Sequence, residues 1–200
     1  MIIHSAVAMV AGWILAATCF LGAQNAPKQD ASINQDSLIL RDFDQRTNVY
    51  VKLRKRAQAS LAAPRSESSA ASIQQYQQVL AQKIRAERIQ AKAGDVFTHP
   101  IGELFRRLIA IPLHSSQGGR IRASLRNAEP VHGLTLEVNQ GYPQTSALQS
   151  TPPTLLLGLP KLPPELEYRL VGRELVLLDT AANLIVDLLP DALPVSRNER

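Results

Sequence analysis

The sequence predicts an α+β protein in which the helices come first and an antiparallel sheet comes last. From residue 38 to residue 125, apolar residues recur at spacings of three, four and seven, which indicates amphipathic helices. After Pro130 the pattern changes to the short runs and alternation that are typical of strands. Hydrophobic residues make up 45% of the chain and aromatic residues only 4%, so the core must consist mainly of Leu, Ile, Val and Ala. This segregation of helices and strands along the chain favours the α+β class.

The first 23 residues are typical of a secretory signal peptide. An uncharged apolar run extends from Ala6 to Leu21, and the small residues Gly22 and Ala23 follow it. At about 16 residues, the run is shorter than the roughly 20 that cross a membrane. We expect cleavage after Ala23, with Ala26 as the alternative, and a mature chain that is periplasmic or secreted. Because no Lys or Arg precedes the run, anchoring by an uncleaved N-terminal segment stays open as the alternative.

Cys19 is the one cysteine of the chain and lies inside this segment. The residues before it form a poor lipobox, so we interpret it as an incidental small residue. After cleavage the chain would have no cysteine, which excludes disulfides, thiolate catalysis and cysteine metal sites in the mature protein. Its stability must then come from its core.

Residues 24–37 are polar and are expected to form a disordered lead-in. A first helix follows, because the stretch from residue 38 to residue 62 has no Gly or Pro and carries apolar residues at helical spacing. These residues are Ile39, Phe43, Tyr50, Leu53, Ala57 and Leu61. Pro64 and the Ser/Ala run within residues 62–72 then mark a linker.

A second helix is expected after the linker, with Ser69 or Ser72 as its N-cap and Gly94 as the residue that ends it. Its apolar stripe consists of Ile73, Tyr76, Leu80 and Ile84. Each stripe needs a partner, so we expect the two helices to pack as an antiparallel hairpin over residues 38–94.

Residues 95–194 are expected to form an α+β domain that begins with a helix. Thr98 is a good N-cap, Pro100 fits the first helical turn, and Pro112 is expected to stop the helix. Its core-facing stripe is Ile101, Leu104, Phe105, Leu108 and Ile109. Gly118-Gly119 opens a short helical turn that is expected to run through residue 125.

An antiparallel meander of three strands is expected between residues 166 and 190, with turns at Gly172 and at residues 180–183. Two further strands are predicted upstream. The segment at 134–142 alternates like a half-buried strand, and the segment at 154–160 is a short apolar run between proline pairs. Residues 195–200 form the expected tail.

Four blocks are spread along nearly the whole mature chain: DFDQRTNVYVKLRKRAQASL (42–61), AGDVFTHPIGELFRRLI (93–109), RIRASLRNAEPV (120–131) and the segment from TPPTLLLGLP to DALP (151–194). Together they resemble a group of uncharacterised exported proteins common in Acidobacteria, which implies export and no known activity. His99, which separates Thr98 from Pro100, is a departure from that group. The last block also resembles the terminal hairpin of periplasmic proteins related to the nickel/cobalt-homeostasis family. That resemblance implies a periplasmic address and rests on Pro163-Pro164, Tyr168-Arg169, Val171-Gly172 and Leu184 to Asp187.

No catalytic, cofactor-binding or metal-binding residues are predicted. The sequence has no Gly-x-Ser-x-Gly elbow, no His-Glu-x-x-His pair and no Ser-x-x-Lys motif. His99 and Glu103 lie one helical turn apart, but a pair is short of the three protein ligands that a metal site needs. We interpret Asp179 and Asp187 as turn or surface residues rather than as an acid-base pair.

The charge is unevenly distributed and suggests an anionic partner. The formal net charge is +5, and residues 83–126 hold nine Lys and Arg against three acids, whereas residues 161–200 hold five against seven. The LRKR run at 53–56 is interpreted as a solubilising part of the first helix's solvent face. Nucleic acid is excluded as a partner, because stacking aromatics are scarce and the chain is expected to be exported. The candidate anion contacts, whose guanidinium groups match phosphate or carboxylate, are Arg106, Arg107, Arg120, Arg122 and Arg126.

Three hypotheses for the function follow from these patterns. The leading one is an exported envelope protein that binds or scaffolds an anionic envelope polymer, a lipid or a partner protein without catalysis. The second is an enzyme of unrecognised type that acts on extracytoplasmic substrates. The third is a self-assembling module that forms a homo-oligomer through the helical hairpin.

Overall fold

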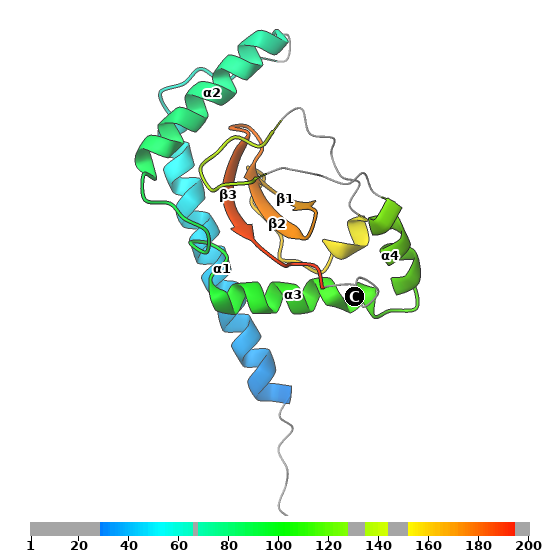
Figure 1. Ribbon diagram of the computed structural model, residues 1–200. Coiled ribbons are helices and arrows are strands. Elements are labelled where there is room, and N and C mark those ends of the chain that lie inside the picture. The colour runs from blue at the N-terminus through cyan, green and yellow to red at the C-terminus, as the bar shows by residue number, and fades with distance from the viewer. Residues whose placement is uncertain (1–28, 66–67, 128–134, 144–151, 195–200) are drawn as a thin grey trace, which may run out of the picture.

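The computed structural model describes residues 29–65, 68–127, 135–143 and 152–194, without the side chains of residues 29–34 and 126–127 (Figure 1). The expected signal peptide at 1–23 and the tail at 195–200 lie outside the described residues. The α+β prediction is confirmed. Four α-helices precede a three-stranded sheet in the described part of the chain: α1 (Gln29–Gln58), α2 (Ala70–Glu87), α3 (His99–Leu113) and α4 (Gly118–Asn127), then the 3₁₀ turn η1 (Pro153–Leu155) and the strands β1 (Leu166–Val171), β2 (Glu174–Asp179) and β3 (Leu184–Leu189).

The helices α1 and α2 pack antiparallel, as expected from their two apolar stripes. Gln58 near the end of α1 donates to Tyr76 near the start of α2, and Tyr50 earlier on α1 lies under the guanidinium of Arg88 just after α2. Ser69 is the N-cap of α2, and its hydroxyl accepts the backbone N–H of Ser72. Figure 1 shows both helices beside the sheet, with α3 crossing α1 and α4 at the far end of α3.

The helix α1 begins earlier than predicted, so the expected disordered lead-in at 24–37 is wrong for residues 29–37. Residues 29–37 are helical, and residues 24–28 lie outside the described residues. Residues 29–37 contain neither Gly nor Pro, so nothing interrupts a helix that propagates from the packed turns after them. A contact with α3 also holds it, because Arg107 donates to Asp36 at 2.6 Å.

The helix α2 ends at Glu87 with Arg88 as its C-cap, so the predicted end at Gly94 is wrong. Arg88 leaves the helical conformation, with φ −128°, and its side chain reaches the backbone of β3 instead. Gly94 does adopt the positive φ of 90° that glycine allows, but it does so inside the loop to α3.

The helix α3 matches its prediction closely. Thr98 occupies the N-cap position, although its hydroxyl makes no capping hydrogen bond, and Pro100 lies in the first turn. Pro112 does not stop the helix where expected, because α3 continues to Leu113. The predicted stripe faces the core, where Ile101, Leu104, Phe105 and Ile109 are buried.

The predicted meander is confirmed, and its strands pair in the order β1-β2-β3. Gly172, with φ 59°, forms the turn between β1 and β2, and Asn183, with φ 47°, lies in the turn before β3. The pairing of β2 with β3 shifts register between Leu177 and Leu178, which marks a β-bulge.

The two additional strands are wrong predictions. Of the segment 134–142, the structure describes residues 135–142. There Gly141 forms only an isolated bridge with Leu184, because Asn139 turns the chain at φ 66°. The segment at 154–160 forms η1 and turns, since Pro152 and Pro153 start a tight turn. Leu155 and Leu159, one helical turn apart, are buried, whereas Leu157 between them is 79% exposed.

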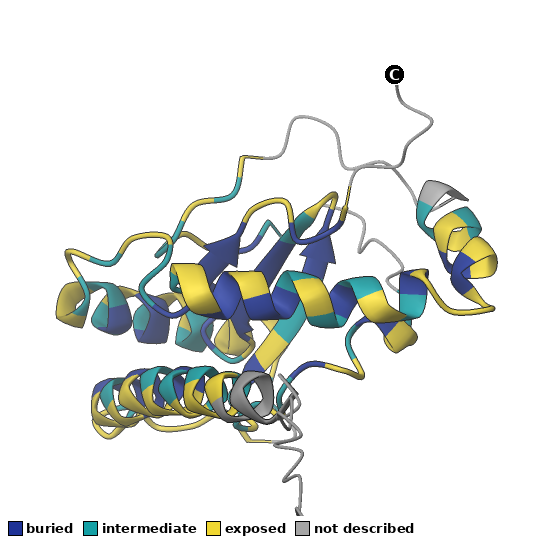
Figure 2. Ribbon diagram, turned by 90° about the horizontal axis from the view of Figure 1, so that it is seen from below, coloured by how far each residue is buried: buried dark blue, intermediate teal, exposed yellow. Residues whose placement is uncertain are grey.

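One hydrophobic core joins the helical hairpin to the sheet. The segments before and after residue 94, where a boundary was expected, therefore share this core. Rings of Phe43, Phe97, Phe105 and Tyr168 pack together with centroids 4.9 to 6.4 Å apart. They belong to a cluster between the helices and one sheet face that also includes Leu80, Ile84, Leu175, Leu177 and Leu184. The other face of the sheet buries Val176, Leu178 and Ile185 beside Tyr142. Exposed residues gather on the outer sides of the helices (Figure 2).

A search of the described helices for a membrane span gives none: each is too short or too polar to cross a bilayer.

We predict that Gly118→Ala destabilises the fold, because a Cβ at Gly118 would overlap the backbone carbonyl of Leu113. Relief of that overlap should move α4 and cost about 1–3 kcal/mol of unfolding free energy. Gly119→Ala is the matched control, since nothing lies within 4 Å of its Cβ position, and it should leave stability unchanged or raise it. Urea unfolding of the two variants decides the matter, and equal effects would contradict the prediction.

Candidate functional site

The first polar centre of the protein is the carboxylate of Asp179, at the end of β2, which is fully buried. Its Oδ2 accepts from the Tyr50 hydroxyl and from Arg54 Nε, each at 2.8 Å, and its Oδ1 accepts from the backbone N–H of Ala182. Arg54 is 6% exposed and also donates to Gln58, which in turn donates to Tyr76 on α2. One ion-pair network therefore connects the sheet to both helices of the hairpin.

The second polar centre is the carboxylate of Asp187 on β3, which is also fully buried. It accepts four backbone N–H groups, from Gly94, Val96, Phe97 and Leu188, at 2.7 to 2.9 Å. Burial raises the pKa of Asp187, and these hydrogen bonds lower it in part. The loop between α2 and α3 thus wraps its backbone around one side chain of the sheet.

The β-bulge in β3 points Asp187 toward this loop. Leu175 pairs with Leu189 and Leu177 pairs with Asp187, but the next pair is Leu178 with Ile185, so Val186 is the extra residue. Strict alternation would place Asp187 on the same face as Ile185, away from the helices. The bulge places it opposite Leu177, which packs against the helices. The carbonyl of Val186 is satisfied by Arg88 Nη2 at 3.1 Å.

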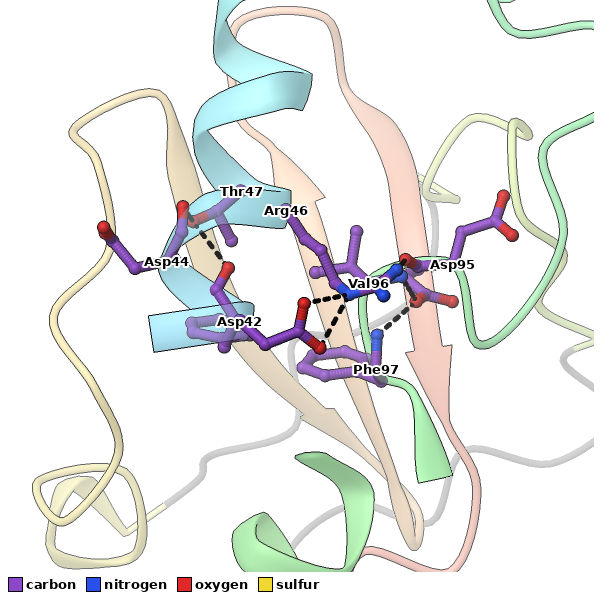
Figure 3. Close-up of polar contacts among 9 residues, drawn as sticks. Asp42, Asp44, Arg46, Thr47, Asp95, Val96 and Phe97 are labelled. Carbon is purple, nitrogen blue, oxygen red and sulfur yellow. Dashed lines mark hydrogen bonds and ion pairs between the residues drawn. The ribbon is translucent and has the colours of Figure 1, made fainter. Parts of the chain in front are cut away.

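The loop around Asp187 is also attached to α1. Arg46 Nη1 donates to the carbonyl oxygen of Asp95 at 2.8 Å, and its Nε donates to both carboxylate oxygens of Asp42 (Figure 3). Figure 3 shows this arginine extending from α1 to the backbone that carries Val96 and Phe97. The loop is therefore fixed from two sides, by β3 and by α1.

The interpretation of Asp187 as a turn or surface residue is wrong, and that of Asp179 holds only in part, because Asp179 Oδ1 accepts the backbone N–H of Ala182 in the turn after β2 but the residue is not on the surface. Both are buried, and both accept hydrogen bonds from segments more than 80 residues earlier in the chain. The sequence contained one signal, because Asp187 interrupts the apolar run LIVDLL, and a strand that is apolar on both faces is not expected to carry an acid. The residues next to Asp187 in the sequence did not indicate which distant groups it contacts.

These two centres hold the fold together rather than perform chemistry. A substrate would have to reach carboxylates that have no exposed surface and whose oxygens already accept hydrogen bonds. Tyr50 is no proton donor to a substrate either, since burial raises its pKa and the neighbouring carboxylate of Asp179 raises it further. Burial also disfavours the charged form of Arg88 and so lowers the pKa of this residue, which contacts Asn139 and the Tyr50 ring.

The structure shows contacts within the protein for three of the five predicted anion-binding arginines. Arg106 donates to the carbonyl oxygens of Pro190 and Asp191 and pairs with Glu103. Arg107 pairs with Asp36 on α1, and Arg122 donates to the carbonyl of Leu113. Arg120 is exposed, and the side chain of Arg126 lies outside the described residues. Three of these guanidinium groups therefore bind groups of the protein itself, in three different places.

The histidine pair gains no further ligand. His99 is exposed, and Glu103 pairs with Arg106. Among the described residues, no group of three or more His, Cys, Asp or Glu side chains could hold a metal ion.

The LRKR run at 53–56 does not form one solvent face, so that interpretation is wrong for half of it. Arg54 is buried in its ion pair with Asp179, and Leu53 packs against the core. Only Lys55 and Arg56 remain exposed, and they pair with Glu165 and Glu87 at 3.4 and 3.8 Å.

A different exposed surface follows the outer side of α1 over residues 38–56, within the part of the helix whose side chains the structure describes. It consists of residues at helical spacing that all lie on the side opposite the buried ring of Phe43: Leu38, Arg41, Gln45, Val49, Lys52 and Arg56. We call these six residues the outer stripe. The stripe contains no acid, and the described residues place no carboxylate within ion-pair distance of Arg41 or Lys52.

An open groove of about 420 Å³ lies between α3, α4 and η1. Its walls are mainly apolar and include Leu108, Pro112 and Ile121. None of the described residues that line it is ionisable, so this groove supplies no acid or base.

Comparison of the chain with protein-family models, with curated proteins and with solved structures gives no match in any of the three.

We predict that Asp187→Asn destabilises the protein by about 2–4 kcal/mol, because an amide nitrogen would face backbone N–H groups that need an acceptor. Asp44→Asn, an exposed position on α1, is the control and should change the unfolding free energy by less than about 0.5 kcal/mol. Chemical denaturation of both variants measures the difference. Equal stability of Asp187→Asn and the parent chain would show that the carboxylate is not needed.

We predict that Tyr50 and Tyr168 stay protonated in the folded protein at pH 11, above the ordinary pKa of 10.0, because burial raises the pKa of both. The unfolded chain releases these protons above pH 10 and the folded chain retains them, so stability falls as the pH rises through that range. Absorbance at 295 nm should therefore lag behind that of the unfolded chain. The variant Tyr50→Phe should weaken the alkaline loss of stability, and full ionisation of all four tyrosines in the folded state would refute the prediction.

Proposed function

We propose that this chain is an exported envelope protein that binds an anionic envelope component without catalysis, through the outer stripe of α1. The observation that carries the proposal is that Arg41 and Lys52 are exposed on one acid-free face and form no ion pair with another described residue. Cations that neutralise no internal charge are available to an external anion.

The arrangement of the other polar groups supports a binding role. The buried carboxylates and Arg54 are used to join the helices to the sheet, and the described groove lining has no ionisable group. The charged groups that remain accessible therefore offer attraction rather than acid-base chemistry. A rigid scaffold behind α1 keeps the cations of the stripe at fixed spacing.

Export is the second part of the proposal. It is supported by the apolar run at 6–21 and by the resemblance to exported proteins of Acidobacteria described above. Either a periplasmic or secreted mature chain, or one anchored by its uncleaved N-terminal segment, would present α1 to the components of the envelope.

We predict that Lys52→Glu weakens salt-dependent retention of the protein on immobilised polyphosphate, because it replaces attraction by repulsion on the outer stripe. Arg120→Glu on α4 is the matched control, since Arg120 is also exposed and the substitution changes the net charge by the same amount. The elution position in a salt gradient is the measurement.

The expected result is earlier elution for Lys52→Glu and unchanged elution for Arg120→Glu. Equal shifts would mean that only net charge matters. A larger shift for Arg120→Glu would favour the arginines predicted from the sequence and would overturn the assignment to α1.

A further inference from the structure

The outer stripe of α1 combines two kinds of exposed residue. Arg41, Lys52 and Arg56 are cationic, whereas Leu38 and Val49 are large apolar side chains that are 54% and 61% exposed. Single exposed apolar residues are common on protein surfaces, but here two of them share one acid-free stripe with three cations at helical spacing.

We infer that the anionic partner of the outer stripe is a bilayer surface rich in anionic lipid headgroups, an inference that rests on the proposed function. A helix face of this composition lies in the plane of the interface, with apolar side chains at the boundary of the acyl chains and Lys and Arg among the phosphates. A dissolved polyanion offers charge but no apolar phase, so it gives Leu38 and Val49 nothing to bury in.

The geometry of the stripe suits a flat surface. Leu38 and Arg56 are 18 residues apart on one helix, which is about 27 Å at 1.5 Å per residue. The opposite side of α1 is fixed to the sheet by Phe43, Tyr50 and Arg54, so the helix can lie on a membrane without losing its core contacts. No unfolding or rearrangement is needed.

The charges of the stripe set the expected strength of the contact. Each Lys or Arg near an anionic leaflet contributes about 1 kcal/mol, and the attraction falls within a Debye length. Arg56 already pairs with Glu87, though at 3.8 Å and with both groups exposed, so Arg41 and Lys52 carry most of the attraction. Binding should therefore be reversible and sensitive to salt.

Among the described side chains of α1, the acids closest to the stripe are Asp42 and Asp44. Asp42 is neutralised by Arg46 at 2.9 Å, and Asp44 is exposed beside the stripe rather than on it. Lys55, next to the stripe on the same side as Asp44, pairs with Glu165. The face that meets the lipid headgroups thus has cations in its middle and the acids at its margin.

The test uses the protein as isolated from the envelope, so that every variant carries the same N-terminus. Leu38→Trp places a fluorophore on the stripe, and Leu157→Trp places one on η1's neighbouring turn, where Leu157 is 79% exposed. Both are mixed with vesicles of phosphatidylglycerol, with vesicles of phosphatidylcholine, and with polyphosphate. Lys52→Glu is introduced into the Leu38→Trp variant to measure the part played by charge.

The expected result is a blue shift of the emission from Leu38→Trp with phosphatidylglycerol vesicles, and no shift with phosphatidylcholine vesicles or polyphosphate. Lys52→Glu should weaken that binding about tenfold or more, because it reverses one charge at the headgroups. The emission of Leu157→Trp should not change.

The two proposals fail in different ways. Retention on polyphosphate that depends on Lys52, without a shift of Leu38→Trp on vesicles, would overturn the lipid surface and leave a polymer or protein as the anionic partner. If Lys52→Glu retained both the binding to polyphosphate and the binding to vesicles, the proposed function would be overturned as well. Equal shifts of Leu38→Trp and Leu157→Trp would show that the contact with the bilayer is not specific to this face, which would also overturn the proposal.

Discussion

The structure depends on the burial of one carboxylate, that of Asp187. A charged group without contact with water is stable only if hydrogen-bond donors replace its hydration. Four backbone N–H groups do this, three of them from the loop between α2 and α3. That loop must therefore lie against β3, and its position determines where α2 ends and where α3 begins. The bulge at Val186 is part of the same arrangement, because it turns the carboxylate toward the loop.

The network of Asp179 connects the remaining parts to this centre. Its ion pair with Arg54 and its hydrogen bond from Tyr50 fix α1 to the end of β2, and Gln58 continues the network to α2. Removal of one partner of a buried ion pair leaves an uncompensated charge, which costs more than the pair itself contributes. The helical hairpin is thus not a separate arm: it shares both the polar networks and the hydrophobic core with the sheet.

This use of polar groups explains why the surface carries the functional proposals. The buried acids and Arg54 join the helices to the sheet, and three of the arginines expected to bind an anion also contact other parts of the chain. The outer stripe of α1 differs from them, since Arg41 and Lys52 are exposed and lie between apolar side chains. A rigid core therefore presents one regular cationic and apolar face, which is the kind of surface that binds at an interface.

The sequence by itself determined the α+β class, most of the apolar faces of α1 to α3, the N-cap position of Thr98 and the meander, because each depends on periodicity or turn chemistry within a few residues. It left Ser69 and Ser72 open as the cap of α2, and the structure selects Ser69. Only the tertiary structure decided the roles of Asp179, Asp187 and Arg54, because their partners lie far away in the chain and one of them depends on a bulge that shifts the register. The same limit explains why the segments at 134–142 and 154–160 are not strands. Their local patterns permitted extended structure, but Asn139 and the proline pair at 152–153 turn the backbone before a ladder can form.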